Sequence, residues 1–389
     1  MARRDVHSDS EVRVAVVGAM GFGRVHLHAL RDITATAALC AVVDPRPLKG
    51  EVEELAAGAP RYASLTDLLA QDRPDVVVIA SPIPTHAPLA EEAMRAGCHV
   101  LLEKPPTATF ADYGHLRRLA RETGSACQVG FQADGSSAYA EIDAVVASGE
   151  IGDVRGVGGV GTWVRDTSYY TRAAWAGRRR VDGVEVVDGV VTNPFAHAVA
   201  AALRLAGARR AEDVAVVETD LFHANDIEAD DTSSVRIVTS SGLPVAVGLT
   251  LCATDNSEPR VIVHGTDGHV VLRYKSDVVD VVSPAGTRRL TCTSTGLLPN
   301  LVGHVRDREV PLLSALDDAG GFMRVMEAVR TAPEPAPIGP EHVTWREDDL
   351  GRHAVVHDVE DWCHRVAEEM QTFSTLGAPW APAHDPAAR

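Results

Sequence analysis

Between residues 11 and 133, short apolar runs alternate with helix-forming segments, and this alternation constrains the fold more than any other feature. The runs Val12–Val17, Ala38–Val43, Asp75–Ala80 and His99–Leu102 are rich in β-branched residues and mostly apolar throughout. Strands without polar alternate positions are typical of a parallel sheet that is covered on both faces. We therefore predict a doubly wound α/β domain, which binds ligands at the carboxyl ends of its strands.

Beyond residue 133 the pattern changes to long alternating runs with few helices. These runs are Val154–Val164, Val214–Thr219, Thr232–Thr239, Leu243–Ala253, Arg260–His264 and His269–Tyr274. They predict an α+β domain with an open, mostly antiparallel sheet. The expected organisation is a polar tail (1–10), the doubly wound domain (11–133), the α+β domain (134–331), a Pro-rich linker (332–340), and a C-terminal helix and tail (341–389), with the helix at 349–375.

A glycine-rich loop follows the first strand. Its members Gly18, Met20, Gly21, Phe22 and Gly23 fit the usual G-x-G-x-x-G spacing, except that Met20 fills the middle glycine position. Such a loop at a helix N-terminus presents backbone N–H groups and the positive end of the helix dipole to a pyrophosphate. The loop therefore predicts dinucleotide binding, although a tight turn without a ligand remains an alternative.

Asp44 ends the second strand, about 20 or more residues beyond the glycine loop. A carboxylate there can bind a ribose 2′-hydroxyl and would repel a 2′-phosphate, which favours NAD over NADP. Arg46 lies two residues later, and its guanidinium could pair with a 2′-phosphate, so NADP remains possible. Asp44 could also simply begin a turn.

Glu103-Lys104-Pro105 follows a buried strand, at the sheet edge where ligands bind. A partly buried lysine there could exchange protons near neutral pH. The alternative is a surface lysine paired with Glu103. The chain contains only three lysines, Lys49, Lys104 and Lys275, among 37 basic residues, so a purely structural cation at position 104 would more often be arginine. Lys49 and Lys275 predict nothing beyond solvated charge.

Asn193 and His197 are four residues apart at the start of an expected helix. This spacing places both side chains on one face of the helix, where they could line the same cleft. The alternative is structural: Asn193 would cap the helix, and His197 would be a buried core residue.

Aromatic and arginine residues gather between positions 163 and 180. Aromatic rings stack on the CH faces of sugars, and guanidinium groups bind hydroxyls or carboxylates, so this segment is a candidate substrate site. An oligomer interface would favour the same residue types. The candidates are Trp163, Arg165, Tyr169, Tyr170, Arg172 and Trp175. A second polar segment, 223–231, is expected to be a solvated loop and lacks metal-ligand spacing, so no metal is predicted.

Four motifs in this order resemble the glucose–fructose oxidoreductase / inositol dehydrogenase (Gfo/Idh/MocA) family. They are the glycine loop followed by His26, the segment Ser81–His86, the segment Glu103–Pro105, and the segment Asn193–His197. The resemblance is strong from about residue 11 to 133 and patchy to residue 275. The second and third motifs, with Gln132, imply cofactor contacts from Ser81, Pro82, His86, Glu103, Lys104 and Gln132.

The resemblance implies an NAD(P)-binding Rossmann domain and a domain for substrate binding and oligomerisation. Typical members oxidise a secondary alcohol of a sugar or polyol, and many are dimers or tetramers that associate through the open sheet. Lys104 would then take the hydroxyl proton as hydride leaves for the nicotinamide, and His197 would bind the same or the adjacent hydroxyl. The expected catalytic residues are Lys104, His197 and Asn193.

Two residues depart from the family pattern. Asn193 stands where the family has aspartate, and Phe195 where it has glycine. Asparagine cannot take a proton, so a dehydrogenase would depend on Lys104 and His197. Two alternatives stay open: an enzyme that cleaves glycosides through transient NAD-dependent oxidation and elimination, and a non-catalytic dinucleotide-dependent binding protein.

The overall charge argues against some classes of binding partner. A net charge of −17 would repel nucleic acid and anionic membranes. No apolar run approaches the length of a membrane span, and the N-terminus lacks a signal-peptide core. None of the six cysteines forms a C-x-x-C pair. We therefore expect a cytoplasmic protein with reduced thiols and a small-molecule carbohydrate or polyol substrate.

Overall fold

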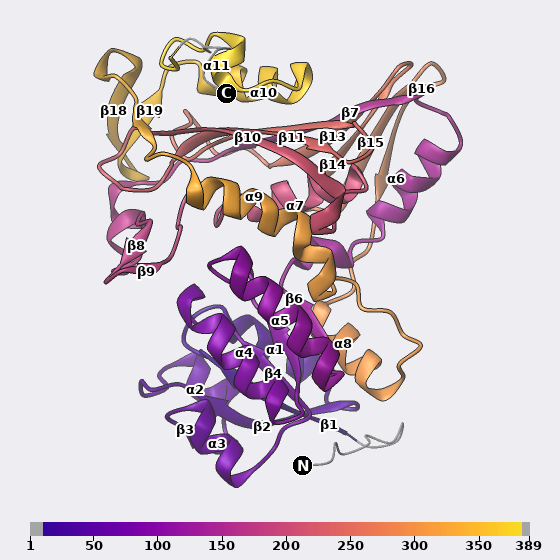
Figure 1. Ribbon diagram of the computed structural model, residues 1–389, viewed down its shortest axis with the longest axis vertical. Coiled ribbons are helices and arrows are strands. Elements are labelled where there is room, and N and C mark those ends of the chain that lie inside the picture. Colours follow the sequence, from indigo (N-terminus) through magenta and orange to yellow (C-terminus); the bar gives the residue numbers. More distant parts are fainter. Residues whose placement is uncertain (1–10, 383–389) are drawn as a thin grey trace. The chain divides into compact units, whose positions relative to one another are not determined.

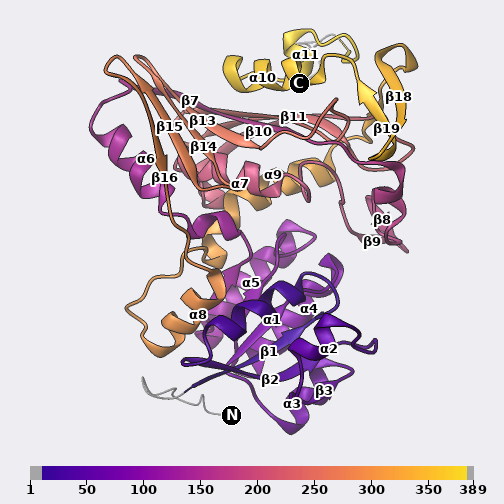
Figure 2. The same cartoon turned by 180° about the vertical axis from the view of Figure 1, so that it is seen from behind.

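The computed structural model describes residues 11–382, which divide into two compact units (Figures 1 and 2). The N-terminal unit runs to Gly135 and includes Thr295–Ala319; the second unit comprises Ser136–Ser294 and the chain from Gly320 onward. The expected polar tail at 1–10 and residues 383–389 of the expected C-terminal tail lie outside the described residues. No helix in the described range is long and apolar enough to cross a membrane.

The N-terminal unit is built on a six-stranded sheet in the order β3-β2-β1-β4-β5-β6, with every neighbouring pair parallel. The strands are β1 (Val12–Val17), β2 (Ala37–Val43), β3 (Arg61–Tyr62), β4 (Val76–Ile79), β5 (His99–Leu102) and β6 (Cys127–Val129). The connecting helices are α1 (Gly23–Asp32), α2 (Glu51–Leu55), α3 (Leu65–Gln71), α4 (His86–Arg95) and α5 (Phe110–Thr123). This confirms the doubly wound fold. The strand order reverses between β1 and β4, where such folds bind ligands.

The core of this unit also includes a helix from a segment that is distant in sequence. Helix α8 (Leu297–Arg306) packs Leu297, Leu301 and Val305 into the same buried cluster as Val12 and Val14. The expected boundary, which assigns residues 295–319 to the second domain, is wrong. An apolar stripe at helical spacing shows that a helix has a buried face, but not which sheet covers it.

The second unit contains a nine-stranded sheet in the order β16-β15-β14-β13-β7-β12-β11-β10-β17. Its strands are β7 (Val154–Thr162), β10 (Val214–His223), β11 (Thr232–Thr239), β12 (Pro244–Thr250), β13 (Arg260–Gly265), β14 (His269–Arg273), β15 (Val278–Ser283), β16 (Gly286–Thr291) and β17 (Ala336–Pro337). All neighbours are antiparallel except the β7–β12 and β10–β17 pairs, which confirms the open, mostly antiparallel sheet. Because β17 pairs with β10, the expected linker 332–340 is partly a strand.

Helices cover both faces of this sheet. Helices α6 (Ala138–Ala147), α7 (Ala196–Leu205) and α9 (Gly320–Thr331) lie on one face, and α10 (Val359–Glu369) and α11 (Phe373–Leu376) lie on the other (Figures 1 and 2). Two glycines allow α10 to approach closely. A Cβ atom added at Gly158 would lie 2.2 Å from the carbonyl oxygen of Ala367, and one at Gly248 would lie 2.7 Å from Cα of Cys363.

The C-terminal region differs from the expected helix at 349–375. Residues before α10 form a hairpin of β18 (Val343–Asp348) and β19 (Gly351–Val356). The turn depends on Gly351, which has a φ of 85° that other residues rarely adopt. A smaller hairpin joins β8 (Arg180–Val181) to β9 (Val184–Glu185). All six cysteines are free thiols, and four of them are buried.

Candidate functional site

In the glycine loop, close packing requires glycine at two positions, whereas the space around a third glycine is open. Gly18 has a φ of 83°, and an added Cβ would lie 2.6 Å from the carbonyl oxygen of Ala80. At Gly23 an added Cβ would lie 2.5 Å from the carbonyl oxygen of Gly18. By contrast, nothing lies within 4 Å of a Cβ added at Gly21. The loop therefore folds tightly against β4 and keeps open space at Gly21, where a ligand could approach its backbone.

The N-terminus of α1 suits an anion. Phe22 occupies the N-cap position without a capping side-chain hydrogen bond, and the first turn contains no acidic residue. The N-terminal N–H groups of a helix and its dipole favour negative charge when no carboxylate already serves them. This end of the N-terminal unit therefore fits a pyrophosphate.

Asp44 links the end of β2 to the glycine loop. Its carboxylate is 1% exposed and accepts hydrogen bonds from the backbone N–H groups of Arg46 (3.0 Å) and Met20 (3.4 Å). Burial alone would raise the pKa of Asp44, but the hydrogen bonds from Arg46 and Met20 outweigh burial and lower it. Asp44 therefore stays ionised. The Arg46 guanidinium lies against this carboxylate, with Nε at 3.2 Å.

Glu103, which precedes Lys104, belongs to a buried polar network. Its Oε1 lies 2.8 Å from His26 Nε2 and accepts a hydrogen bond from Gln132 Nε2 at 3.0 Å. The backbone N–H of Lys104 lies 3.3 Å from Glu103 Oε2. Two sequence motifs that are far apart in the chain, together with Gln132, thus meet at one carboxylate, which lies beside the backbone of Lys104.

His86, an expected cofactor contact, instead holds two loops together. Its Nδ1 lies 2.8 Å from the carbonyl oxygen of Pro105, and its Nε2 lies 2.8 Å from that of Ser81. The side chain is buried, which lowers its pKa, whereas the two carbonyl contacts favour the protonated ring, because a neutral imidazole can donate to only one of them. His86 therefore joins the loop after β4, which includes Ser81 and Pro82, to the loop after β5.

In the second unit, Asn193 does not cap α7. The N-cap residue of α7 is Phe195, and no side chain caps the helix. Asn193 instead donates from Nδ2 to Oδ1 of Asp188 at 2.6 Å. The other oxygen of Asp188 accepts from Arg172 at 3.1 Å and from the backbone N–H of Gly177 at 2.9 Å. No sequence motif indicates this buried carboxylate, which ties together the segment 172–193.

Replacing Asn193 with aspartate should destabilise the protein rather than restore a family feature. Two carboxylates would then face each other across 2.6 Å, and the lost hydrogen bond together with charge repulsion should lower the free energy of unfolding by about 1–3 kcal/mol at pH 7. The loss should shrink at pH 5, because the close pair would bind a proton more readily than an isolated carboxyl group. Urea unfolding at both pH values measures this difference.

Asn256→Asp is the matched control for Asn193→Asp. Asn256 uses Oδ1 to accept from the backbone N–H of Val164, and aspartate keeps that acceptor. Its stability should therefore stay close to that of the wild type. Equal stability of wild type and Asn193→Asp at pH 7 would show that the Asp188 contact contributes nothing.

Phe195 and His197 flank the start of α7 and play different parts. Phe195 is fully buried over β7, where a Cβ added at Gly161 would lie 2.5 Å from its ring. Its ring centroid is 4.3 Å from that of Trp163. His197 is only partly buried, which argues against the core alternative, and its ring centroid lies 6.5 Å from that of Tyr274.

The candidate substrate segment contains an alternating row of cations and aromatic rings. The Arg165 guanidinium lies 4.7 Å from the ring centroid of Trp163 and 5.3 Å from that of Tyr169. Arg172 lies 3.7 Å from the Tyr169 centroid and 4.7 Å from the Trp175 centroid. Tyr170 differs from these residues, because its hydroxyl is buried and burial raises its pKa well above the ordinary value.

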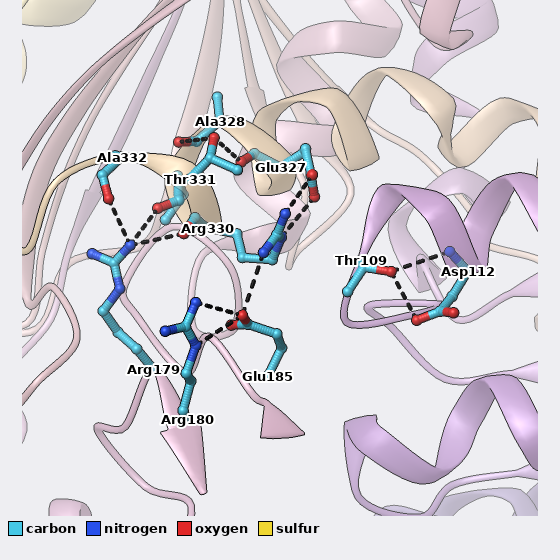
Figure 3. Close-up of polar contacts among 11 residues, drawn as sticks. Thr109, Asp112, Arg179, Arg180, Glu185, Glu327, Ala328, Arg330, Thr331 and Ala332 are labelled. Carbon is cyan, nitrogen blue, oxygen red and sulfur yellow. Dashed lines mark hydrogen bonds and ion pairs between the residues drawn. The ribbon is translucent and has the colours of Figure 1, made fainter. Parts of the chain in front are cut away.

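The arginines at the end of this segment are structural (Figure 3). Arg179 donates to the carbonyl groups of Val329, Arg330, Ala332 and Pro333, at the end of α9. Arg180 pairs with Glu185 at 2.8 Å, and Arg178 pairs with Glu228. Cations near a helix C-terminus complement its dipole. These three arginines therefore give no support to an anionic substrate.

The polar segment 223–231 is not the solvated loop that we expected. Asp230 and Asp231 are buried and satisfied by hydrogen bonds. Asp231 accepts from the backbone N–H groups of Ala224 and Asn225, and Asp230 accepts from the Ser233 hydroxyl. Buried carboxylates persist only with such partners, and here they order the connection between β10 and β11. No cluster of three potential metal ligands occurs within residues 11–382.

Two models of one protein family match the chain. The model described as "Oxidoreductase family, NAD-binding Rossmann fold" matches residues 12–131, and "GFO/IDH/MocA C-terminal domain" matches residues 139–271. Together the two matches cover more than half of the chain.

Curated relatives match over shorter lengths. An inositol 2-dehydrogenase from Rubrobacter xylanophilus is 36% identical over 155 residues, which cover 38% of this chain and 43% of the relative. A dTDP-3,4-didehydro-2,6-dideoxy-alpha-D-glucose 3-reductase from Streptomyces violaceoruber is 47% identical over 81 residues, 21% of this chain and 24% of the relative. The chain thus spans less than half the length of these curated relatives.

Solved structures match over most of the chain at low identity. The WlbA dehydrogenase from Bordetella pertussis, in complex with NADH and UDP-GlcNAcA, has a TM-score of 0.70 and 22% identity, and the match covers 83% of this chain and 95% of that one. This likeness establishes the shared fold. The two family models show that the chain belongs to the Gfo/Idh/MocA oxidoreductase family and carries its NAD-binding Rossmann domain.

Proposed function

We propose that this protein is an NAD-dependent oxidoreductase that moves a hydride between a secondary alcohol of a sugar or sugar-like polyol and nicotinamide. The observation that carries the proposal is Lys104, which lies two residues beyond the end of β5 in a Rossmann domain of this family. Ligands of doubly wound sheets bind beyond the carboxyl ends of such strands. The relative named inositol 2-dehydrogenase supports a polyol substrate, and the relative named a 3-reductase of a dTDP-linked deoxyglucose supports a sugar.

Lys104 is the proposed acid–base catalyst. Bound NAD would supply the acceptor for the hydride. Lys104 would take the hydroxyl proton during oxidation and return it during reduction, which a lysine amine can do and a guanidinium cannot. Glu103 acts as a positioning residue, because His26 and Gln132 hold its carboxylate beside the Lys104 backbone.

His197 is the proposed partner for a substrate hydroxyl. It is partly exposed in the first turn of α7 and can offer a ring nitrogen as donor or acceptor. Asn193 acts through Asp188, which its amide group holds in place. We therefore assign proton transfer to Lys104 and hydroxyl binding to His197, with Asn193 in a positioning role.

Asp44 supports NAD as the preferred dinucleotide. Its ionised carboxylate adjoins the glycine loop and would repel a 2′-phosphate. Arg46, which could have offset that repulsion, already lies against Asp44. NADP is therefore the weaker candidate.

A homo-oligomer remains a prediction. The fold restricts which part of the open sheet could form its interface. Helix α10 covers β7 and β12 on one face of the open sheet, so association through that face would use β14–β16. On those strands Asp280 pairs with Arg273 and Arg289. The hydrogen bond from Arg289 leads the contributions that lower the pKa of Asp280 to about 2. These strands therefore carry a charged cluster of Arg273, Asp280 and Arg289.

Turnover tests the proposal directly. The full chain is incubated with NAD and a panel of inositols, hexoses and hexuronic acids, while the absorbance of reduced nicotinamide is followed. At least one hydroxylated compound should be oxidised, with slower or no reaction when NADP replaces NAD. Release of a leaving group from a glycoside, with no net nicotinamide reduction, would instead favour the elimination chemistry.

A further inference from the structure

Trp163 lines a groove in the second unit that the proposed hydride transfer does not itself require. The groove has a volume of about 530 Å³, and its lining includes Trp163, Arg165, Asn256, Ser257, Glu258 and Lys275. It lies between the end of β7, the segment before β13 and the turn after β14 that carries Lys275. One aromatic ring and two cations thus share a single opening.

Trp163 is held rigidly in this groove. Its indole N–H donates to the carbonyl oxygen of Ser257 at 3.1 Å. Its ring packs against buried Phe195, which in turn fills the space above Gly161. A partly exposed aromatic ring fixed in this way offers a preformed stacking surface, which costs little conformational entropy when a ligand binds.

Cations border Trp163 at two positions. The Arg165 guanidinium lies 4.7 Å from the Trp163 ring centroid, and the Lys275 ammonium group lies 5.2 Å from it. Neither cation forms an ion pair with any residue in the described range 11–382, whereas Arg172 further along the row is paired with Asp188. Glu258 also lines the groove, so its charged side chains comprise two cations and one carboxylate.

Trp163 in the groove contacts the segment that carries His197. Phe195, which supports Trp163, lies two residues before His197. Tyr274, which precedes Lys275, has its ring centroid 6.5 Å from that of His197. A ligand on Trp163 would therefore lie beside the elements that hold the proposed hydroxyl-binding histidine.

We infer that this groove binds the anionic part of the substrate, and that the substrate is a sugar carrying a carboxylate or phosphate group. The anion would bind Arg165 and Lys275, which lie over the indole ring of Trp163. As these two side chains turn toward the anion, the CH face of the sugar ring would stack on Trp163. This inference rests on the proposed function, because it names the substrate class of the same site. Lys275, for which the sequence suggested only a solvated charge, becomes a specificity-determining residue.

Binding to the full chain without NAD tests the inference. The protein is titrated with glucose, glucuronate, glucose 6-phosphate and inorganic phosphate, and binding is followed by calorimetry and tryptophan fluorescence. One anionic sugar should bind at least tenfold more tightly than glucose, with an affinity that falls as salt is added. The better of glucuronate and glucose 6-phosphate identifies the anionic group. Inorganic phosphate should bind more weakly than the sugar phosphate, because it cannot stack on Trp163.

Variants locate that binding in the groove. Arg165→Gln and Lys275→Gln should each weaken binding of the anionic sugar roughly tenfold and leave glucose binding unchanged, since each removes one charge-assisted contact. Arg352→Gln is the matched control, because Arg352 lies 4.7 Å from the ring centroid of Trp345 on the β18–β19 hairpin. It should bind the anionic sugar like the wild type. Thermal melting checks that all three variants fold.

Three results would overturn the inference: equal affinity for glucose and both anionic sugars, unchanged anionic-sugar binding in both groove variants, or phosphate binding as tight as that of the sugar phosphate. Different results would distinguish failure of this inference from failure of the proposed oxidoreductase function. Turnover of a neutral polyol, with no faster turnover of either anionic sugar, would overturn the inference and keep the oxidoreductase. Anionic-sugar binding that depends on Arg165 and Lys275, without nicotinamide reduction, would support the groove and reject the oxidoreductase.

Discussion

Lys104→Arg should reduce kcat by about 10²–10⁴-fold, the range typical of a lost general acid–base catalyst. Arginine preserves the positive charge and most of the length of the side chain, but its guanidinium does not release a proton near neutral pH. Lys104→Met should be equally inactive, since it removes both the charge and the proton. Steady-state kcat, together with the rate of a single turnover at saturating NAD, measures the effect.

Lys49→Met is the control for both Lys104 variants. Lys49 is exposed in the loop before α2, and its replacement should leave kcat unchanged. If Lys104→Arg kept its kcat within a few-fold of the wild-type value, proton transfer by Lys104 would be refuted. Electrostatic orientation of the substrate would then be the only role left for this side chain.

Gly158→Ala should be strongly destabilising, although it adds only one methyl group. The added methyl group would lie 2.2 Å from the carbonyl oxygen of Ala367, so the backbone of α10 would have to move away from β7. Overpacking of this kind costs about 1–3 kcal/mol. The expected fall in Tm is about 2–4 °C for each kcal/mol lost, as is typical for domains of this size. Calorimetric melting gives both quantities.

The reactivity of the Cys363 thiol gives a second measure of the displacement of α10. This thiol is fully buried, the backbone of Cys363 lies against Gly248, and burial raises the pKa of the thiol well above the ordinary value. Gly158→Ala should increase its rate of labelling by a thiol reagent. The control is Gly114→Ala in α5, where the nearest atom lies 3.7 Å from the added methyl group and the substitution should stabilise by up to about 1 kcal/mol. Wild-type stability and labelling in Gly158→Ala would mean that α10 does not pack closely on β7.

Local sequence patterns predicted the N-terminal fold well because each element carries its own signals. Helix α5 spans Phe110–Thr123, with Thr109 as a capping residue and Gly124 in a left-handed conformation after it. Such capping signals are encoded within a few residues. Helix α8 has an apolar face as well, but its assignment to the N-terminal unit depends on contacts with residues almost 300 positions earlier. The hairpin before α10 was missed because its turn, around Gly351, interrupts a segment that was interpreted as helix.

The candidate site shows the same division between residues in local motifs, which the sequence predicts, and contacts between distant residues, which it does not. Lys104, Asp44 and the glycine loop belong to motifs in which spacing alone indicates chemistry. The contacts between Asn193 and Asp188, and between Trp163 and Lys275, had no such signal. The second of these pairs joins residues more than 100 positions apart through the pairing of β7, β13 and β14. The order of the strands in the sheet determines that these two side chains meet, and no sequence motif predicts that order.

The central claim is that this chain works with NAD, and its melting temperature in the presence of NADH or NADPH tests that claim most directly. A ligand at 100 times its Kd stabilises the folded state by about 2.7 kcal/mol. Saturating NADH should therefore raise Tm by several degrees, and NADPH at the same concentration should raise it less, because Asp44 adjoins the glycine loop. An unchanged Tm with both dinucleotides at millimolar concentration would contradict the account.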